Sequence, residues 1–232
     1  MFEFDFSLLL RGQYHEMLVA GLLLSLKLAA VTLVFAVPLA MLVALLRLAP
    51  LRALQWLGFA YVESIRNVPL LAHMLFWYFA APEWLPEDLK AWLYAGNIEA
   101  ASAIVALTLY TAAFMSEDMR SGIRAVPTVQ LEAARALGFG YLASMRLVIL
   151  PQALRITVPP LISQTLNLWK NTSIATVIGV AELMYQAGQV ESSTFRSFES
   201  FAFATVAYLS VSLLITGAAA WYQQRYPGVE RR

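Results

Sequence analysis

Residues 126–151 read VPTVQLEAARALGFGYLASMRLVILP and form the longest polar-rich interval between strongly apolar segments of the chain. The pattern predicts a short helix over residues 130–137, because Gly138 and Gly140 follow it and glycine accepts the positive φ that ends a helix. A second helical run is expected from about Tyr141. A compact helix–glycine–helix element between apolar segments indicates a docking site for a soluble partner.

The composition is typical of a protein that crosses a membrane several times. Of the 232 residues, 60% are hydrophobic and 13% are charged, whereas a soluble domain carries about a quarter charged residues. The absence of cysteine from the sequence excludes disulfides and cysteine-based metal sites. A formal net charge of +1, with dispersed basic residues, gives no reason to expect nucleic-acid binding.

Five apolar regions predict an all-α protein with five membrane-spanning helices, over residues 17–46, 53–81, 100–116, 156–181 and 201–222. We expect an interfacial segment over residues 1–16, a five-span domain over residues 17–225 and a tail over residues 226–232.

Two of these regions should be irregular. In the second, only residues 68–81 form an uninterrupted apolar run, so this span should include a bent lead-in helix. In the fourth, Pro159-Pro160 and the polar run that begins at Asn167 should make the helix discontinuous. Residues 182–200 are expected to form a polar external segment.

The distribution of charge predicts the topology. Nine arginines fall on the side of residues 126–151, and the opposite side is mainly acidic. By the positive-inside rule, the N-terminus is outside, and residues 126–151 and the C-terminus are cytoplasmic. The nine arginines are Arg47, Arg52, Arg120, Arg124, Arg135, Arg146, Arg225, Arg231 and Arg232.

Motifs for catalysis are missing from the sequence. It contains no Gly-Lys pair, which a phosphate-binding P-loop requires. Its two histidines, His15 and His73, are far apart and do not form a zinc-hydrolase motif. We therefore expect a chain that is not an enzyme by itself and that binds no metal.

Lys170 is the most informative charge within an apolar region. A lysine deep inside a span costs roughly 2.5–3.5 kcal/mol on insertion, so it should face the bundle interior or a water-filled cavity. Asn167, Asn171, Thr172 and Ser173 lie beside it. The cation could attract a substrate carboxylate, or it could pair with a buried acid such as Glu63.

Glu63 and Arg66 lie three residues apart, on one face of a helix, where they can form an ion pair. Such a pair could brace the bundle or act in gating.

Several stretches together resemble the permease subunits of ABC importers. Glu132-Ala133-Ala134, Gly138 and the run Val-Ile-Leu-Pro that ends at Pro151 are similar to the cytoplasmic loop of that family, Glu-Ala-Ala … Gly … Ile-x-Leu-Pro. Three further stretches resemble the branch that imports polar amino acids, which includes histidine, glutamine and glutamate/aspartate permeases. They are YVESIRNVPLL, YTAAFMSEDMRSGIRAVP and LWKNTSIATVIGVAEL. The opening MFEFDFS is similar to the glutamate/aspartate subgroup.

Two of the positions at which the chain departs from that branch carry polar side chains. His73 stands where the branch often has glutamine, and Asn171 stands where it commonly has aspartate. Loss of the aspartate removes one acceptor for a substrate ammonium, which favours an acidic substrate over a basic one.

The resemblance implies a type I ABC importer permease (MetI-like) fold in the bacterial inner membrane. A dimer of separate ATPase subunits would bind ATP and Mg²⁺ and receive the coupling helix, a second permease subunit would complete the pathway, and an extracytoplasmic binding protein would deliver the amino acid. The chain itself would contact membrane lipid and bind no cofactor. The implied coupling residues are Gln130, Glu132, Ala133, Ala134, Leu137, Gly138 and Pro151, and the implied path residues are Asn167, Lys170, Asn171, Thr172, Ser173, Glu63 and Arg66.

Other interpretations remain open from the residues. The chain could be a permease for another polar or basic amino acid. It could also be an autonomous secondary transporter or channel, although such proteins usually have more spans and internal repeats, or a membrane scaffold without transport. Glu132 could be a solvated charge at a helix N-terminus, which the helix dipole favours in any case.

Overall fold

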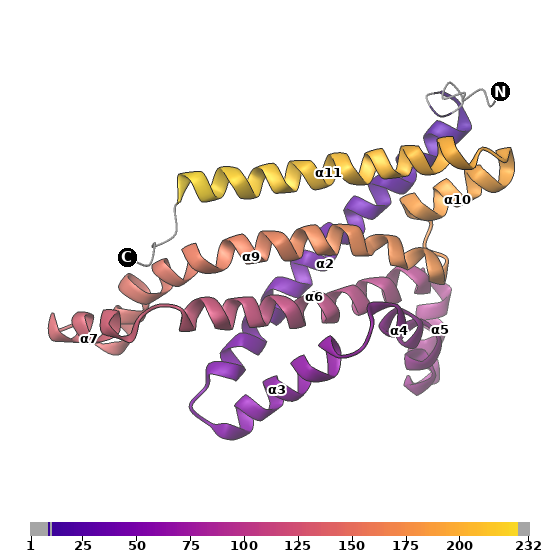
Figure 1. Cartoon of the computed structure of the whole chain (residues 1–232). Helices are drawn as coiled ribbons and strands as arrows, with labels where there is room; N and C mark the ends of the chain where they lie inside the picture. Colours follow the sequence, from indigo (N-terminus) through magenta and orange to yellow (C-terminus); the bar gives the residue numbers. More distant parts are fainter. Residues whose placement is uncertain (1–8, 10, 227–232) are drawn as a thin grey trace.

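The chain folds into a bundle of helices, shown in the computed structural model of Figure 1, which describes residue 9 and residues 11–226. This part of the chain contains no β-strand. Four long helices dominate it: α2 (Gln13–Leu48), α6 (Ile98–Arg124), α9 (Leu150–Asn171) and α11 (Ser197–Arg225). The predictions for residues 1–8 and 227–232 lie outside the described residues.

The shorter elements connect these long helices. They are α3 (Arg52–Arg66), α4 (Leu70–Leu75), the π-helical turn η1 (Phe76–Ala80), the 3₁₀ turn η2 (Ala81–Trp84), α5 (Glu87–Ala95), α7 (Thr128–Ala136), α8 (Tyr141–Ser144), the π-helical turn η3 (Met145–Ile149), the 3₁₀ helix η4 (Thr172–Ile178) and α10 (Leu183–Thr194).

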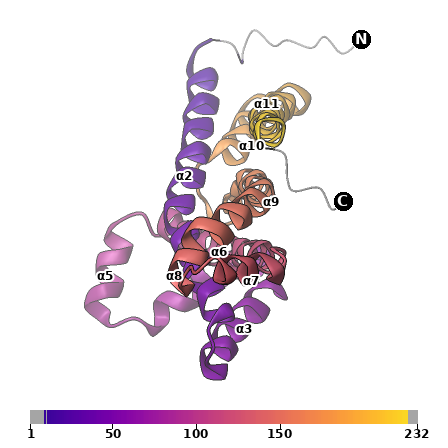
Figure 2. The same ribbon diagram turned by 90° about the vertical axis from the view of Figure 1, so that its left-hand side faces the viewer.

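The long helices pack around small residues. In Figure 1, α6, α9 and α11 run in nearly the same direction and α2 crosses them obliquely; Figure 2 looks almost along the three helices and shows α9 between α6 and α11, both of which it contacts. Ala36 and Ala40 of α2 are buried against Ala112 and Met115 of α6, the helix that α2 contacts most extensively. Small side chains let two helix backbones approach closely, which is how helices associate in a membrane, where the hydrophobic effect does not drive them together.

The tightest approach joins α6 to α9. Gly122 of α6 is buried, and a Cβ added to it would overlap the hydroxyl of Thr157 on α9. That hydroxyl donates a hydrogen bond to the carbonyl of Ala153 at 2.8 Å, which fixes the side chain in this position. Any larger residue at position 122 would therefore require the Thr157 side chain or the two helices to shift.

Four stretches are long and apolar enough to cross a membrane: residues Gln13–Leu48, Ile98–Arg124, Tyr141–Ile178 and Ser197–Arg225. The predicted second span, residues 53–81, is not a continuous helix. Helix α3 ends at Arg66 and α4 begins after Pro69, because proline disfavours helical geometry at the residue before it. The bent lead-in helix is thus confirmed, while five spans and their orientation stay predictions.

The fourth predicted span changes form at a different place from the one expected. Pro159 and Pro160 lie inside α9, which continues through them, so the prediction of a break at the proline pair is wrong. Neighbouring groups can compensate for the lost backbone donors of prolines inside membrane helices. The change comes at the polar run, where α9 gives way to η4 at Thr172 and η4 ends at Gly179, with φ 86°.

Residues 182–200, predicted to be a polar external segment, contain the helix α10. Its inner face is buried through Leu183, Ala187 and Val190, which pack with Leu18 of α2 and Ala204 of α11. The apolar residues recur at helical spacing within a polar sequence, so the overall composition of the segment does not reveal that one face of a helix is buried.

Candidate functional site

The short helix predicted within residues 126–151 is present as α7, and it ends at the expected place, just before Gly138. Gly138 has φ 84°, its N–H donates to the carbonyl of Arg135 at 2.9 Å, and the N–H of Phe139 donates to the carbonyl of Ala134 at 3.1 Å. These two bonds form a Schellman motif, which requires a left-handed residue just after the helix. Gly138 fills that position because it has no Cβ.

One face of this loop packs against the bundle. Ala134 is buried, and Val126, Ile149 and Ala153 form a small apolar cluster that includes the inner side of Leu131. The amide of Gln152 donates to the Gln130 side chain at 3.4 Å. The implied coupling residues therefore fall into two groups. The buried Ala134 and the half-buried Gln130 hold the loop against the bundle, and the remaining five are exposed.

The outer face of the loop combines charge with exposed apolar side chains. Glu132, Ala133, Leu137, Gly138 and Pro151 are exposed. The same loop carries further exposed apolar side chains that the sequence reasoning missed, among them Val129, Phe139, Tyr141 and Leu142, the last of which is 81% exposed. Together with Leu137 these four form what we call the loop patch. Several exposed apolar side chains on one loop are typical of a site of protein or membrane contact, and the sequence signal was the run of aromatic and aliphatic residues in an otherwise polar interval.

A cavity of about 450 Å³ lies between α6 and α9. Asn167, Lys170 and Asn171, three of the residues expected in the substrate path, line it together with Gln164 and Leu168 of α9. Helix α6 contributes Tyr110, Thr111 and Phe114, none of which was predicted. The other α9–η4 candidates lie outside the lining: Thr172 is buried, and its hydroxyl donates to the carbonyl of Trp169 at 2.8 Å, while the Ser173 hydroxyl donates to the carbonyl of Lys170 at 2.8 Å.

Lys170 forms no ion pair with any carboxylate in the described part of the chain. The alternative that it pairs with Glu63 is wrong in this structure, because none of the ion pairs joins the two residues; the Glu63 carboxylate accepts a hydrogen bond from Asn67 at 3.0 Å instead. Lys170 is exposed and carries the only charge among the residues named as lining the cavity. Its positive charge is therefore available to a ligand.

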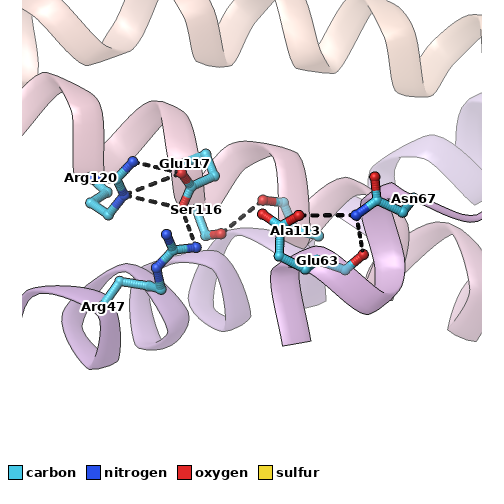
Figure 3. Close-up of polar contacts among 7 residues, drawn as sticks. All are labelled: Arg47, Glu63, Asn67, Ala113, Ser116, Glu117 and Arg120. Atoms are coloured by element: carbon cyan, nitrogen blue, oxygen red, sulfur yellow. Dashed lines mark hydrogen bonds and ion pairs between the residues drawn. The ribbon is translucent and has the colours of Figure 1, made fainter. Parts of the chain in front are cut away.

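Glu63 and Arg66 do not pair with each other in this structure, so that prediction is also wrong. Figure 3 shows the Glu63 side chain directed to Asn67. The guanidinium of Arg66 lies 4.8 Å from the centre of the Phe114 ring, a cation–π contact. Arg66 thus lies behind one wall of the cavity rather than in its lining.

Comparisons with known proteins identify the family to which this architecture belongs. Residues 36–227 match the family described as "Binding-protein-dependent transport system inner membrane component". The chain belongs to that family. The permease is 39% identical, over 221 residues, to the "Probable glutamine ABC transporter permease protein GlnM" of Bacillus subtilis (strain 168), covering 95% of this chain and 94% of that protein. It is also 39% identical, over 175 residues, to the "Glutamate/aspartate import permease protein GltJ" of Escherichia coli (strain K12), covering 74% of this chain and 71% of that protein.

Solved structures agree with the fold of the permease. A "Crystal structure of an amino acid ABC transporter with histidines" matches 97% of this chain and 100% of that chain, with a TM-score of 0.83 and 29% identity. The MetNI methionine ABC transporter shares the fold, with a TM-score of 0.68 at 20% identity over 91% of this chain and 97% of that chain. The permease is thus a polar amino acid ABC importer subunit, a multi-pass protein of the inner membrane and a transporter component rather than an enzyme, as the motifs predicted.

Two polar networks of the permease, one half-buried and one fully buried, were not found from the sequence. In the first, Glu117 of α6 pairs with Arg120 at 2.7 Å and with Arg47 of α2 at 2.9 Å (Figure 3). The pair Glu117–Arg120 has helical i,i+3 spacing and could have been expected. Arg47 is distant in sequence, and only the packing of α2 on α6 brings it there.

The second network surrounds Glu182, whose side chain is 0% exposed. One carboxylate oxygen accepts hydrogen bonds from the hydroxyls of Ser25 (3.1 Å) and Tyr208 (2.8 Å). The other accepts from the backbone N–H of Tyr185 at 2.9 Å, as the N-cap of α10. This carboxylate joins α2, α10 and α11.

Proposed function

We propose that the permease forms the translocation pathway of an ATP-driven importer whose substrate is an acidic amino acid, glutamate or aspartate. The observation that carries this proposal is the cavity between α6 and α9, whose named lining contains one cation, Lys170, and no carboxylate. Glutamine is a second candidate substrate, because the proteins similar to this permease include a probable glutamine permease as well as a glutamate/aspartate permease.

The lining chemistry favours an anion over a cation. Every amino acid brings an α-carboxylate, and an acidic one brings a second carboxylate that a free ammonium group attracts. A basic amino acid would bring a second cation next to Lys170, with no acceptor charge in the lining to balance it. The amides of Gln164, Asn167 and Asn171 supply neutral donors and acceptors for the rest of the substrate.

The loop patch supports coupling to a separate ATPase. It presents exposed apolar side chains beside Glu132 on an anchored helix, and small Ala133 allows a partner to approach closely. In this proposal the patch contacts an ATPase dimer that binds ATP and Mg²⁺, two permease subunits form the path, and a binding protein delivers the amino acid on the other side. The orientation that this requires, with five spans and the loop in the cytoplasm, is the one predicted from the arginines.

Coupling is tested by co-purification of the ATPase with Glu132→Lys and Gly138→Asp variants. We expect both variants to lose most of the ATPase, while Glu87→Lys, an exposed charge reversal on α5, retains it. Unchanged ATPase recovery with both loop variants would refute the coupling role.

The substrate is tested by ATP hydrolysis of the assembled complex with its binding protein. We expect glutamate and aspartate to stimulate hydrolysis, and arginine and histidine to have no effect. Stimulation by glutamine alone would replace the acidic assignment with the second candidate. Amino acid uptake into liposomes by this chain without any ATPase would instead favour an autonomous transporter.

A further inference from the structure

A second cavity, of about 420 Å³, lies at the end of the bundle next to the loop. Four arginines line it: Arg47 at the end of α2, Arg52 at the start of α3, and Arg120 and Arg124 at the end of α6. Figure 1 shows that the α2–α3 turn, the end of α6 and α7 lie toward the same side of the molecule. This cavity is separate from the one that contains Lys170.

The charges around this cavity do not balance. Glu117 pairs with both Arg47 and Arg120, but Arg52 and Arg124 form no ion pair within the described residues. Four guanidinium groups thus line the cavity, no carboxylate is among the residues named as lining it, and Glu117 pairs with only two of the four. An anion is the ligand that such a site attracts.

Arg47 is held in place and still has binding capacity. Its stem packs against Gly58 of α3, where an added Cβ would lie 3.0 Å from the arginine Cγ, and its guanidinium lies 5.4 Å from the centre of the Phe59 ring. The Nη1 atom is 2.9 Å from Glu117 but forms no well-aligned hydrogen bond. Guanidinium groups present paired N–H donors that match the oxygens of a phosphate group.

The apolar surroundings indicate that the phosphate belongs to a lipid. Trp56, which lines the cavity, is 70% exposed, and Leu51, Leu57 and Phe59 on the same stretch are exposed as well. Tryptophan is enriched where a membrane meets water, and the cavity opens where the long apolar helix α2 ends, at Leu48. A phosphate in the cavity would have its acyl chains beside the exposed side chains of α3.

We propose that this cavity binds the phosphate of an anionic phospholipid from the leaflet on the loop side of the bundle. Basic pockets between membrane helices bind anionic headgroups in this way. The proposal depends on the membrane location of the permease and not on its substrate.

The test titrates the delipidated complex of permease and ATPase with phosphatidylglycerol or phosphatidylcholine and counts bound lipid by native mass spectrometry. The site variant carries Arg52→Gln and Arg124→Gln. The matched control carries Arg155→Gln and Arg225→Gln, two exposed arginines outside the cavity with the same change of charge. We expect phosphatidylglycerol to bind about tenfold or more weakly to the site variant, since each arginine near a membrane surface contributes roughly a factor of five.

The control variant should bind phosphatidylglycerol as the parent complex does, and phosphatidylcholine should bind weakly to all. Equal loss in the control, or equal binding of both lipids to the parent, would overturn the proposal. Displacement of the lipid by millimolar inorganic phosphate would assign the cavity to a soluble anion instead. The single variant Arg52→Gln, expected to weaken binding about fivefold, decides the question if the double variant does not fold.

Discussion

The hydroxyl of Tyr208 donates a hydrogen bond to the buried carboxylate of Glu182 at 2.8 Å, joining α11 to the start of α10 across 26 residues of sequence. The hydroxyl of Ser25 donates to the same oxygen and brings in α2. The first and last long helices of the bundle are therefore fastened to each other through one side chain of a short helix between them.

Replacement of Glu182 by alanine should destabilise the permease by about 2–4 kcal/mol, because it removes a helix N-cap and the acceptor of the half-buried Tyr208 hydroxyl, whereas the Ser25 hydroxyl can still donate to the carbonyl of Gly21. The thermal unfolding midpoint of the purified permease in detergent measures this loss. Glu16→Ala removes an exposed acid in the first turn of α2 and serves as the control. Similar midpoints for the two variants would contradict the structural role of Glu182.

Gly138→Ala should weaken the end of α7 by about 1–2 kcal/mol, since an L-residue is strained at φ 84°. The change adds no steric contact, because nothing lies within 4 Å of the added Cβ. Faster amide hydrogen exchange at residues 138 and 139 measures the opening of the Schellman motif. Gly140→Ala is the matched control, because Gly140 has φ −66° and equally open surroundings; equal exchange in both variants would refute the prediction.

Gly122→Ala should destabilise the permease by about 1–3 kcal/mol through overpacking between α6 and α9. The additional change Thr157→Gly removes the hydroxyl and Cβ against which the new methyl group would press. Gly122→Ala should therefore lower the unfolding temperature less in the Thr157→Gly variant than in the parent permease. Gly217→Ala, on α11 with nothing within 4 Å, should have little effect. Additive losses in the double variant would argue against direct contact.

Lys170→Met should raise the KM for glutamate uptake by the assembled importer about tenfold or more, the equivalent of one charge-assisted hydrogen bond of about 1.5–3 kcal/mol. Lys27→Met replaces another exposed lysine within a long apolar helix, outside the cavity, and should leave KM unchanged. An unchanged KM for Lys170→Met, with normal amounts of protein, would remove Lys170 from the substrate path.

Features that depend on neighbouring residues in the sequence could be predicted. The helix of the loop and its end at Gly138 follow from local backbone chemistry, and the structure confirms both. The interruption before Pro69 follows from the same kind of local constraint. The lining by Asn167, Lys170 and Asn171 was predicted because these polar residues share one stretch of an apolar helix.

Features that depend on packing between distant segments could not be predicted. The proline pair does not interrupt α9, because local breaking tendency yields to the surrounding bundle. Glu182 looked like part of a solvated segment, and its partners Ser25 and Tyr208 lie on helices far away in sequence. The expected pairing of Glu63 with Arg66 had suitable spacing, but Asn67 and Phe114 offered competing contacts.

The contact of Gly122 with Thr157 has a mechanical consequence. Gly122 lies just before the loop and Thr157 shortly after it, so the two helices that carry α7 touch near its base, where the Thr157 side chain packs directly on the backbone of Gly122. Force applied to α7 would then move the end of α6 and the start of α9 together rather than separate them.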